Sequence, residues 1–161
     1  MRTQTTACLG AACLLAAGAI TSGAQARIVI GQGIAGVKIG DGQARVTKVL
    51  GSHHRVVPPT WVYGRTHVGF GHTRHVNDIW TTSRRQRTSR GIGPGASVAA
   101  VRRAYPDVRC YRRSRRGPIV ACGLRTKHRH RTIKTDFLFD GRLREVDVFL
   151  ILPRGGTPLR K

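Results

Sequence analysis

The chain has 161 residues, a formal net charge of +22 and four cysteines. This length excludes an assembly of several large domains, and the charge favours anionic partners over cationic ones. With one glutamate and six aspartates, the chain is poorly supplied with carboxylates for acid–base catalysis, so we expect a protein that is not an enzyme.

Residues 1–26 have the pattern of a secretory signal peptide. Arg2 precedes an apolar stretch from Ala7 to Ile20, and the segment ends with Ala24-Gln25-Ala26. This pattern predicts cleavage after Ala26 and a secreted or extracytoplasmic protein. A lipoprotein anchored at Cys13 is the alternative, although the apolar stretch continues beyond that cysteine. We expect no transmembrane segment in the mature chain.

Residues 27–82 form the first predicted unit. A short strand over 27–30 and a glycine-rich turn precede a helix over 43–50, which Asp41 is expected to cap and Gly51 to end. The rest of the unit is predicted to be one loop and three strands, over residues 52–59, 60–63, 67–70 and 74–80.

A basic linker over residues 83–90 leads to the second predicted unit, residues 91–151. Its helix is expected to begin after Ser97 and to run to Tyr105, where Pro106 ends it. Two hairpins and a basic loop between them follow, with strands over 108–111, 119–124, 135–139 and 143–151 and the loop over 125–131. Residues 152–161 are predicted to be a basic tail.

One pattern occurs in both units. Segment 36–51 matches segment 91–106 at an offset of 55 residues, and Phe70, Val76 and Ile79 match three later residues at an offset of 67, namely Phe137, Leu143 and Val146. Repetition of this kind indicates that one supersecondary unit is used twice. We therefore predict an α+β fold of two tandem units, each with a short helix packed on an antiparallel β-meander.

The repeated pattern places glycine at the helix entrance and Leu-Gly or Tyr-Pro at its exit. It is carried by two sets of residues, Gly40, Val46, Leu50, Gly51, Trp61 and Tyr63 in the first copy and Gly95, Val101, Tyr105, Pro106 and Phe137 in the second. It resembles the tandem modules of the β-lactamase-inhibitory-protein-like superfamily and of the related small outer-membrane assembly lipoproteins. The resemblance implies an exposed concave sheet surface and protein binding without catalysis. No inhibitory residue carries over, because no interface motif matches.

Two cysteines remain once the signal peptide is removed. Cys110 and Cys122 form an even pair in an exported chain, and a hairpin folded around residues 115–118 would place them opposite each other. We predict a disulfide, which should contribute about 2–3 kcal/mol by closing this short loop. Two buried free thiols are the alternative, and metal binding is less favoured because the chain has no second cysteine pair.

The positive charge is concentrated in the second half of the chain. Sixteen Arg or Lys residues and one acid, Asp107, lie between residues 84 and 134. Guanidinium groups bind phosphate and carboxylate bidentately, so this region is our candidate anion-binding surface. Its proposed members are Arg109, Arg112, Arg113, Arg115, Arg116, Arg125, Lys127, Arg129 and Arg131. The alternative is that the charge reflects composition and only keeps the protein soluble.

Two further motifs bear on metal or cofactor binding. His67, His72 and His75 surround one predicted hairpin and form a weak candidate metal site, with ordinary exposed histidines as the alternative. The segment from Gly31 to Gly36 matches G-x-G-x-x-G after a strand, but no helix begins within it and no acid follows at the required distance. We therefore expect no cofactor.

These observations favour a secreted, non-catalytic binding module whose Arg-rich surface holds an acidic protein or an anionic cell-envelope polymer. A protein inhibitor or envelope assembly factor that binds a protein partner through its concave sheet is the alternative. Nucleic acid would bind only nonspecifically, because the chain carries no nucleic-acid-recognition motif.

Overall fold

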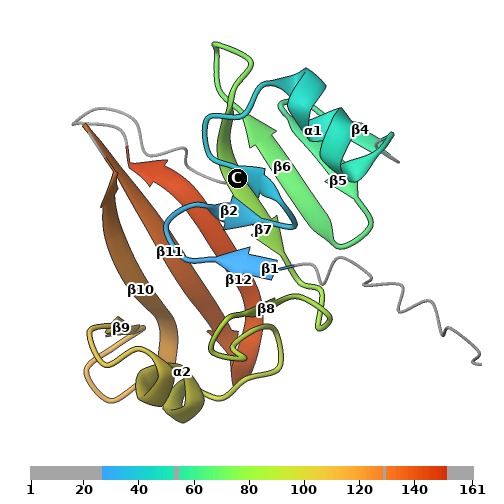
Figure 1. Ribbon diagram of the computed structural model, residues 1–161. Helices are drawn as coiled ribbons and strands as arrows, with labels where there is room; N and C mark the ends of the chain where they lie inside the picture. Colours follow the sequence, from blue (N-terminus) through green and yellow to red (C-terminus); the bar gives the residue numbers. More distant parts are fainter. Residues whose placement is uncertain (1–26, 53–54, 129, 152–161) are drawn as a thin grey trace, which may run out of the picture.

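The computed structural model describes residues 27–52, 55–128 and 130–151. These residues form an eight-stranded sheet, a four-stranded sheet and two short helices (Figure 1). The predicted signal peptide and the predicted basic tail lie outside the described residues. Within the described residues, no helix has the length and apolar character needed to cross a membrane.

The elements follow one another in a simple order along the chain. Three short strands, β1 (Arg27–Val29), β2 (Gly33–Ile34) and β3 (Val37–Lys38), precede helix α1 (Gln43–Leu50). Four strands come next: β4 (Arg55–Val57), β5 (Thr60–Tyr63), β6 (Thr66–Phe70) and β7 (Val76–Thr81). Strand β8 (Arg87–Thr88) leads to helix α2 (Val98–Ala104) and the last strands, β9 (Arg109–Arg112), β10 (Ile119–His128), β11 (Arg131–Asp140) and β12 (Arg142–Ile151).

The predicted α+β fold of two helix-on-meander units is wrong. The strands after α1 and the strands after α2 belong to one antiparallel sheet, with the order β4-β5-β6-β7-β12-β11-β10-β9. The two halves join where β7 pairs with β12, with Ile79 opposite Val148. Among the described elements, the two helices have eight and seven residues, so the protein is mostly β.

A second sheet, absent from our prediction, contains β3, β2, β1 and β8 in that order. Strand β1 pairs in parallel with β8, which lies in the predicted linker, with Ile28 opposite Thr88. These strands have two or three residues each, which is too short to produce a clear alternation of apolar and polar residues.

The glycine run of the first strands packs the small sheet against the large one. The Gly31 N–H donates to Thr135 Oγ1 over 2.9 Å, and a Cβ at Gly31 would lie 2.3 Å from Thr126 Oγ1. At Gly33, a Cβ would lie 1.9 Å from the Val37 carbonyl oxygen. The close approach of neighbouring atoms therefore accounts for Gly31 and Gly33, whereas Gly36 has a φ of 82°.

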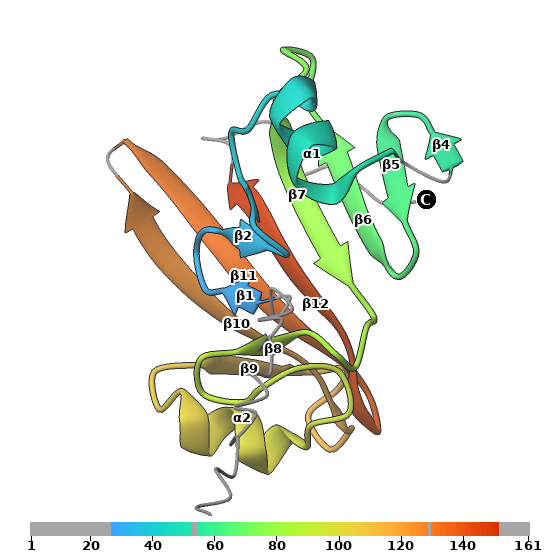
Figure 2. The same cartoon turned by 45° about the vertical axis from the view of Figure 1, so that its right-hand side comes forward.

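The core lies between the two sheets and beneath the helices. The small sheet, α1 and α2 all cover the same face of the large sheet, which we call the inner face (Figures 1 and 2). Val46 of α1, Val101 of α2 and Phe137 of β11 are fully buried there, and the ring of Tyr105 stacks 5.7 Å from that of Phe137. The opposite face is called the outer face below.

The helix boundaries confirm most of the capping prediction. The Ala100 N–H donates to Ser97 Oγ over 3.1 Å, so Ser97 caps α2. Helix α1 ends at Gly51, whose φ of 79° is favourable for glycine. The N-cap of α1 is Gly42 and not Asp41, because the Asp41 carboxylate instead accepts the Lys38 N–H over 2.8 Å.

Two predicted loops contain strands. Residues 55–57 of the loop over 52–59 form the edge strand β4, and residues 125–128 of the loop over 125–131 continue β10. In β10, Arg125 and Lys127 are exposed whereas Thr126 is half-buried. Charged side chains on one side of a half-buried strand resemble a polar loop in sequence, which explains the second error.

Candidate anion-binding site

A disulfide-bridged hairpin forms one end of the large sheet. Strands β9 and β10 pair with Cys110 opposite Cys122, and the structure confirms the predicted bond between them. Cys122 is fully buried and lies beside the inner-face residue Phe137. Because side chains alternate along a strand, Arg109 and Tyr111 lie on the outer face.

The turn of this hairpin is held by hydrogen bonds. The Arg113 N–H donates to the Pro118 carbonyl over 3.3 Å, and the Gly117 N–H donates to the Ser114 carbonyl over 3.1 Å. Arg112 Nη1 donates to the Gly117 carbonyl over 2.8 Å. The turn therefore presents exposed cationic side chains from a braced backbone.

A groove of about 360 Å³ lies beside the hairpin. Its lining includes three cationic side chains, one aromatic ring and one carboxylate, with the full set being Asp107, Arg109, Tyr111, Gly123, Leu124, Arg125 and Lys134. We call it the basic groove. Strand pairing explains this composition, since Arg109 lies opposite Gly123 and Arg125 lies opposite Lys134.

Gly123 leaves room for an ion pair at the floor of the basic groove. Lys134 Nζ lies 2.7 Å from Asp136 Oδ2. A Cβ at Gly123 would lie 2.4 Å from Asp136 Oδ1 and 2.9 Å from Lys134 Cε. The absence of a side chain on β10 therefore allows the two β11 side chains to lie over this strand.

Lys134 is further held between two aromatic rings. Its Nζ lies 5.8 Å from the ring centroid of Tyr111 on β9 and 5.6 Å from that of Phe149 on β12. Such distances allow cation–π attraction. The ammonium group is thus oriented before any ligand arrives, although its side chain keeps 21% of its surface exposed.

The structure brings together part of the predicted anion-binding set. Arg109 and Arg125 line the basic groove, and the other described members are exposed at the hairpin turn or along the neighbouring strands, namely Arg112, Arg113, Arg115, Arg116, Lys127 and Arg131. Arg129 lies outside the described residues. In the part of the chain that the structure describes, none of these arginines forms an ion pair with a carboxylate.

Sequence reasoning missed Lys134, Asp136 and Gly123. Their role depends on the register of β10 and β11, in which Gly123 faces Asp136 and Arg125 faces Lys134. The alternation of polar and apolar residues over 132–139 could have indicated that Lys134 and Asp136 lie on one face. The length of β10 was the missing information.

Four carboxylates lie on the outer face of the large sheet, and one of them, Asp136, borders the basic groove. On β11 and β12, Asp136 lies opposite Asp147 and Leu138 lies opposite Glu145. On β7, Asp78 lies opposite Phe149 of β12. These four of the seven acids of the chain therefore lie on β7, β11 and β12. The β9–β10 hairpin carries five arginines between residues 109 and 116, which gives this end of the sheet a positive potential.

The three histidines proposed as weak metal ligands do not form a site. His67 stacks on Trp80 with ring centroids 3.5 Å apart, while His75 Nδ1 lies 2.7 Å from the Thr73 carbonyl oxygen and His72 is in an exposed turn. Within residues 27–52, 55–128 and 130–151, no three potential ligand side chains come close enough to hold a metal ion.

Comparison of the chain with protein-family models, curated proteins and solved structures finds no match. The resemblance to β-lactamase-inhibitory-protein-like modules therefore stays a prediction.

Proposed function

We propose that the protein is an exported, non-catalytic binding module that holds an acidic protein segment or an anionic cell-envelope polymer at the β9 end of its large sheet. The observation that carries this proposal is the basic groove, in which Arg109, Arg125 and Lys134 surround Gly123 beside a disulfide-bridged hairpin. The disulfide supports an oxidising, extracytoplasmic location.

The cations of the basic groove are suited to different parts of an anionic ligand. The exposed guanidinium groups of Arg109 and Arg125 can each bind a carboxylate or phosphate through two parallel N–H donors. Lys134 provides a compact charge that is already oriented between Tyr111 and Phe149. A ligand anion would compete with Asp136 for this ammonium group, so the arginines should supply most of the affinity.

The hairpin turn extends the cationic surface beyond the basic groove. Arg112, Arg115 and Arg116 are exposed, and the turn that carries them is braced by the Arg112–Gly117 hydrogen bond. A linear polymer with regularly spaced anionic groups could contact the groove and the turn together. Such contacts raise the effective concentration of the next anionic group along the polymer, which favours polymers over single anions.

The experiment compares two variants of equal net charge on heparin and poly-glutamate columns. Arg109→Gln/Arg125→Gln removes two charges from the basic groove, and Arg102→Gln/Arg103→Gln removes two exposed charges from α2. We expect the groove variant to elute at clearly lower salt than the α2 variant. Its solution affinity for poly-glutamate should fall about tenfold or more, because charge-assisted hydrogen bonds are lost.

Equal elution of the two variants would overturn the proposal and show that only net charge matters. A protein partner retained at high salt by the native protein and the groove variant alike would also overturn it. That result would support binding through the sheet surface, the alternative that the sequence raised.

A further inference from the structure

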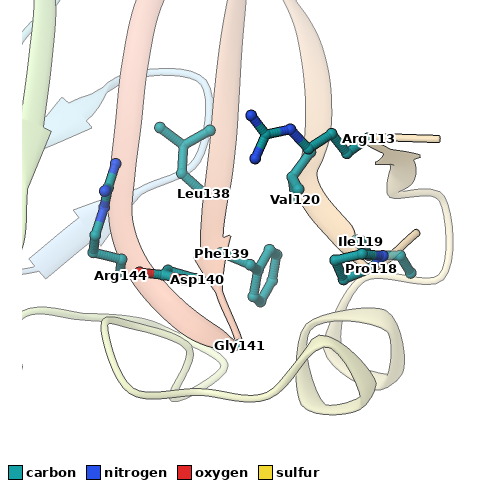
Figure 3. Close-up of a pocket in the computed structure, with 9 residues that line it drawn as sticks. All are labelled: Arg113, Pro118, Ile119, Val120, Leu138, Phe139, Asp140, Gly141 and Arg144. Atoms are coloured by element: carbon teal, nitrogen blue, oxygen red, sulfur yellow. The ribbon is translucent and has the colours of Figure 1, made fainter.

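A second cavity lies at the end of the large sheet where two hairpin turns come together. Its volume is about 370 Å³, which is within the range of small-molecule sites. It is lined by residues in and next to the β9–β10 and β11–β12 turns (Figure 3), namely Arg113, Pro118, Ile119, Val120, Leu138, Phe139, Asp140, Gly141 and Arg144. We call it the turn pocket.

Two irregularities in strand pairing shape the turn pocket. The register of β9 and β10 shifts between Ile119 and Ala121, and that of β11 and β12 shifts between Leu138 and Phe139. A β-bulge bends its strand and redirects side chains, and bulges are frequent beside functional sites. Here both register shifts occur at residues that line the same cavity, so an apolar surface opens between two turns.

The lining of the turn pocket combines apolar and cationic groups. The side chains of Ile119, Val120 and Leu138 are half-buried and supply an apolar floor. In Figure 3 the Leu138 side chain lies between the guanidinium groups of Arg113 and Arg144, which come from different hairpins. In the described part of the chain, neither guanidinium forms an ion pair, including with the nearby Asp140 carboxylate.

We propose that the turn pocket binds a small amphiphilic anion, with a carboxylate or phosphate head carried on an acyl chain. The head would lie between Arg113 and Arg144, and the chain would cover Val120 and Leu138. Inorganic anions are less suited to this site, because they gain nothing from burying its apolar floor. Neutral lipids are less suited because they leave both guanidinium groups without an anionic partner. The inference goes beyond the proposed polyanion binding, which needs no apolar contact.

The test is isothermal titration calorimetry with decanoate below its micelle concentration. Decanoate should bind. Acetate has the same head without the chain and decanol has the chain without the charge, so each should bind at least about tenfold more weakly. Decyl phosphate should bind as decanoate does, because both heads accept bidentate hydrogen bonds.

Matched variants separate the turn pocket from general charge. Arg144→Gln should weaken decanoate binding about tenfold or more, whereas Arg142→Gln, an exposed residue of the same strand that does not line the pocket, should have little effect. Val120→Thr, which keeps the shape but adds a hydroxyl group, should also weaken decanoate more than acetate. Equal effects of the two arginine variants, or equal binding of acetate and decanoate, would overturn the proposal.

Two further measurements separate this site from the basic groove and distinguish the source of the ligand. Arg109→Gln/Arg125→Gln should retain decanoate binding, while Arg144→Gln should retain poly-glutamate binding. Loss of decanoate binding in the groove variant would therefore overturn the turn pocket as a separate site. Binding to phosphatidylglycerol vesicles that depends on Arg144 but not on Arg142 would identify a membrane lipid as the source, and decanoate binding without vesicle binding would identify a free amphiphile.

Discussion

Gly123 lies beneath the ion pair of Lys134 and Asp136, and any side chain at this position would collide with it. Gly123→Ala would place a Cβ 2.4 Å from Asp136 Oδ1, so the pair must move. We expect a loss of stability of about 1–3 kcal/mol from overpacking, measured by urea unfolding. Heparin elution should also shift, because the basic groove changes shape.

The matched control is Gly71→Ala, where the nearest atom to a Cβ is Asn77 Nδ2 at 3.4 Å and φ is not positive. That distance is an ordinary contact, so the variant should stay within about 0.5 kcal/mol of the native stability. Equal loss in both variants would mean that the position of Gly123 under the ion pair has no special importance.

Ser97 shows how a single hydroxyl group fixes the start of a short helix. Its Oγ accepts the Ala100 N–H at 3.1 Å, and α2 has only seven residues. Ser97→Ala should lower the free energy of unfolding by about 1 kcal/mol, because this N–H loses its partner. Ser89→Ala, at an exposed turn, should change urea unfolding little. A Ser97→Ala variant as stable as the native protein would exclude capping as a contribution.

The bridged hairpin is the element on which both proposed binding sites depend. Cys110 and Cys122 are 12 residues apart, and loop-closure entropy for a loop of this size predicts about 2–3 kcal/mol of stabilisation. Cys110→Ala/Cys122→Ala should lose that amount in urea unfolding, and reductant should destabilise the native protein to the same extent. If reductant also destabilised the variant, the effect could not be assigned to this bond.

At the level of elements, local signals in the sequence predict the positions of some helices, strands and turns, but not which distant strands pair with one another. The helix over 43–50, the strand over 60–63 and the Asp140-Gly141 turn each have a strong local signal, and the structure places them as predicted. The small sheet depends on the pairing of β1 with β8, in which Ile28 lies opposite Thr88, and no local pattern encodes a contact between segments so far apart in the sequence. The continuous large sheet depends in the same way on the pairing of β7 with β12.

The candidate site could be predicted only in part for a related reason. Arginine density alone indicated Arg109 and Arg125. The contribution of Lys134 depends on a register that extends to the last residue of β10, where His128 lies opposite Arg131. The turn pocket depends on two register shifts, and neither Ile119 nor Leu138 carries a local signal for a bulge. Pairing between strands, rather than the strands themselves, was the missing information.

The docking of the two sheets is the first property that belongs to the whole molecule. The Gly31 N–H of the small sheet donates to Thr135 Oγ1 of the large sheet over 2.9 Å, and this bond is buried. Thr135→Val keeps the side-chain shape but removes the acceptor, which should lower stability by about 1–3 kcal/mol in urea unfolding.

Thr132→Val is the control for Thr135→Val, because Thr132 is on the same strand but half-buried on the outer face. It should change the free energy of unfolding by about 0.5 kcal/mol or less. If Thr135→Val left the stability unchanged, the hydrogen bond between Gly31 and Thr135 would contribute nothing to sheet docking.

Net charge is the second property of the whole molecule, and it opposes folding while it promotes binding. The chain carries +22, and sixteen of its cations lie between residues 84 and 134, so folding brings like charges together. The Debye length falls from about 10 Å at 0.1 M salt to about 3 Å at 1 M, which weakens this repulsion. We therefore expect the free energy of urea unfolding to rise with NaCl concentration, whereas a fall would indicate that attractive ion pairs dominate.

At fixed low salt, poly-glutamate should stabilise the native protein more than Arg109→Gln/Arg125→Gln, because a ligand stabilises the folded state in proportion to the logarithm of its affinity. If poly-glutamate stabilised the two proteins equally, the basic groove would contribute nothing to this stabilisation, and neutralisation of the net charge alone would account for it.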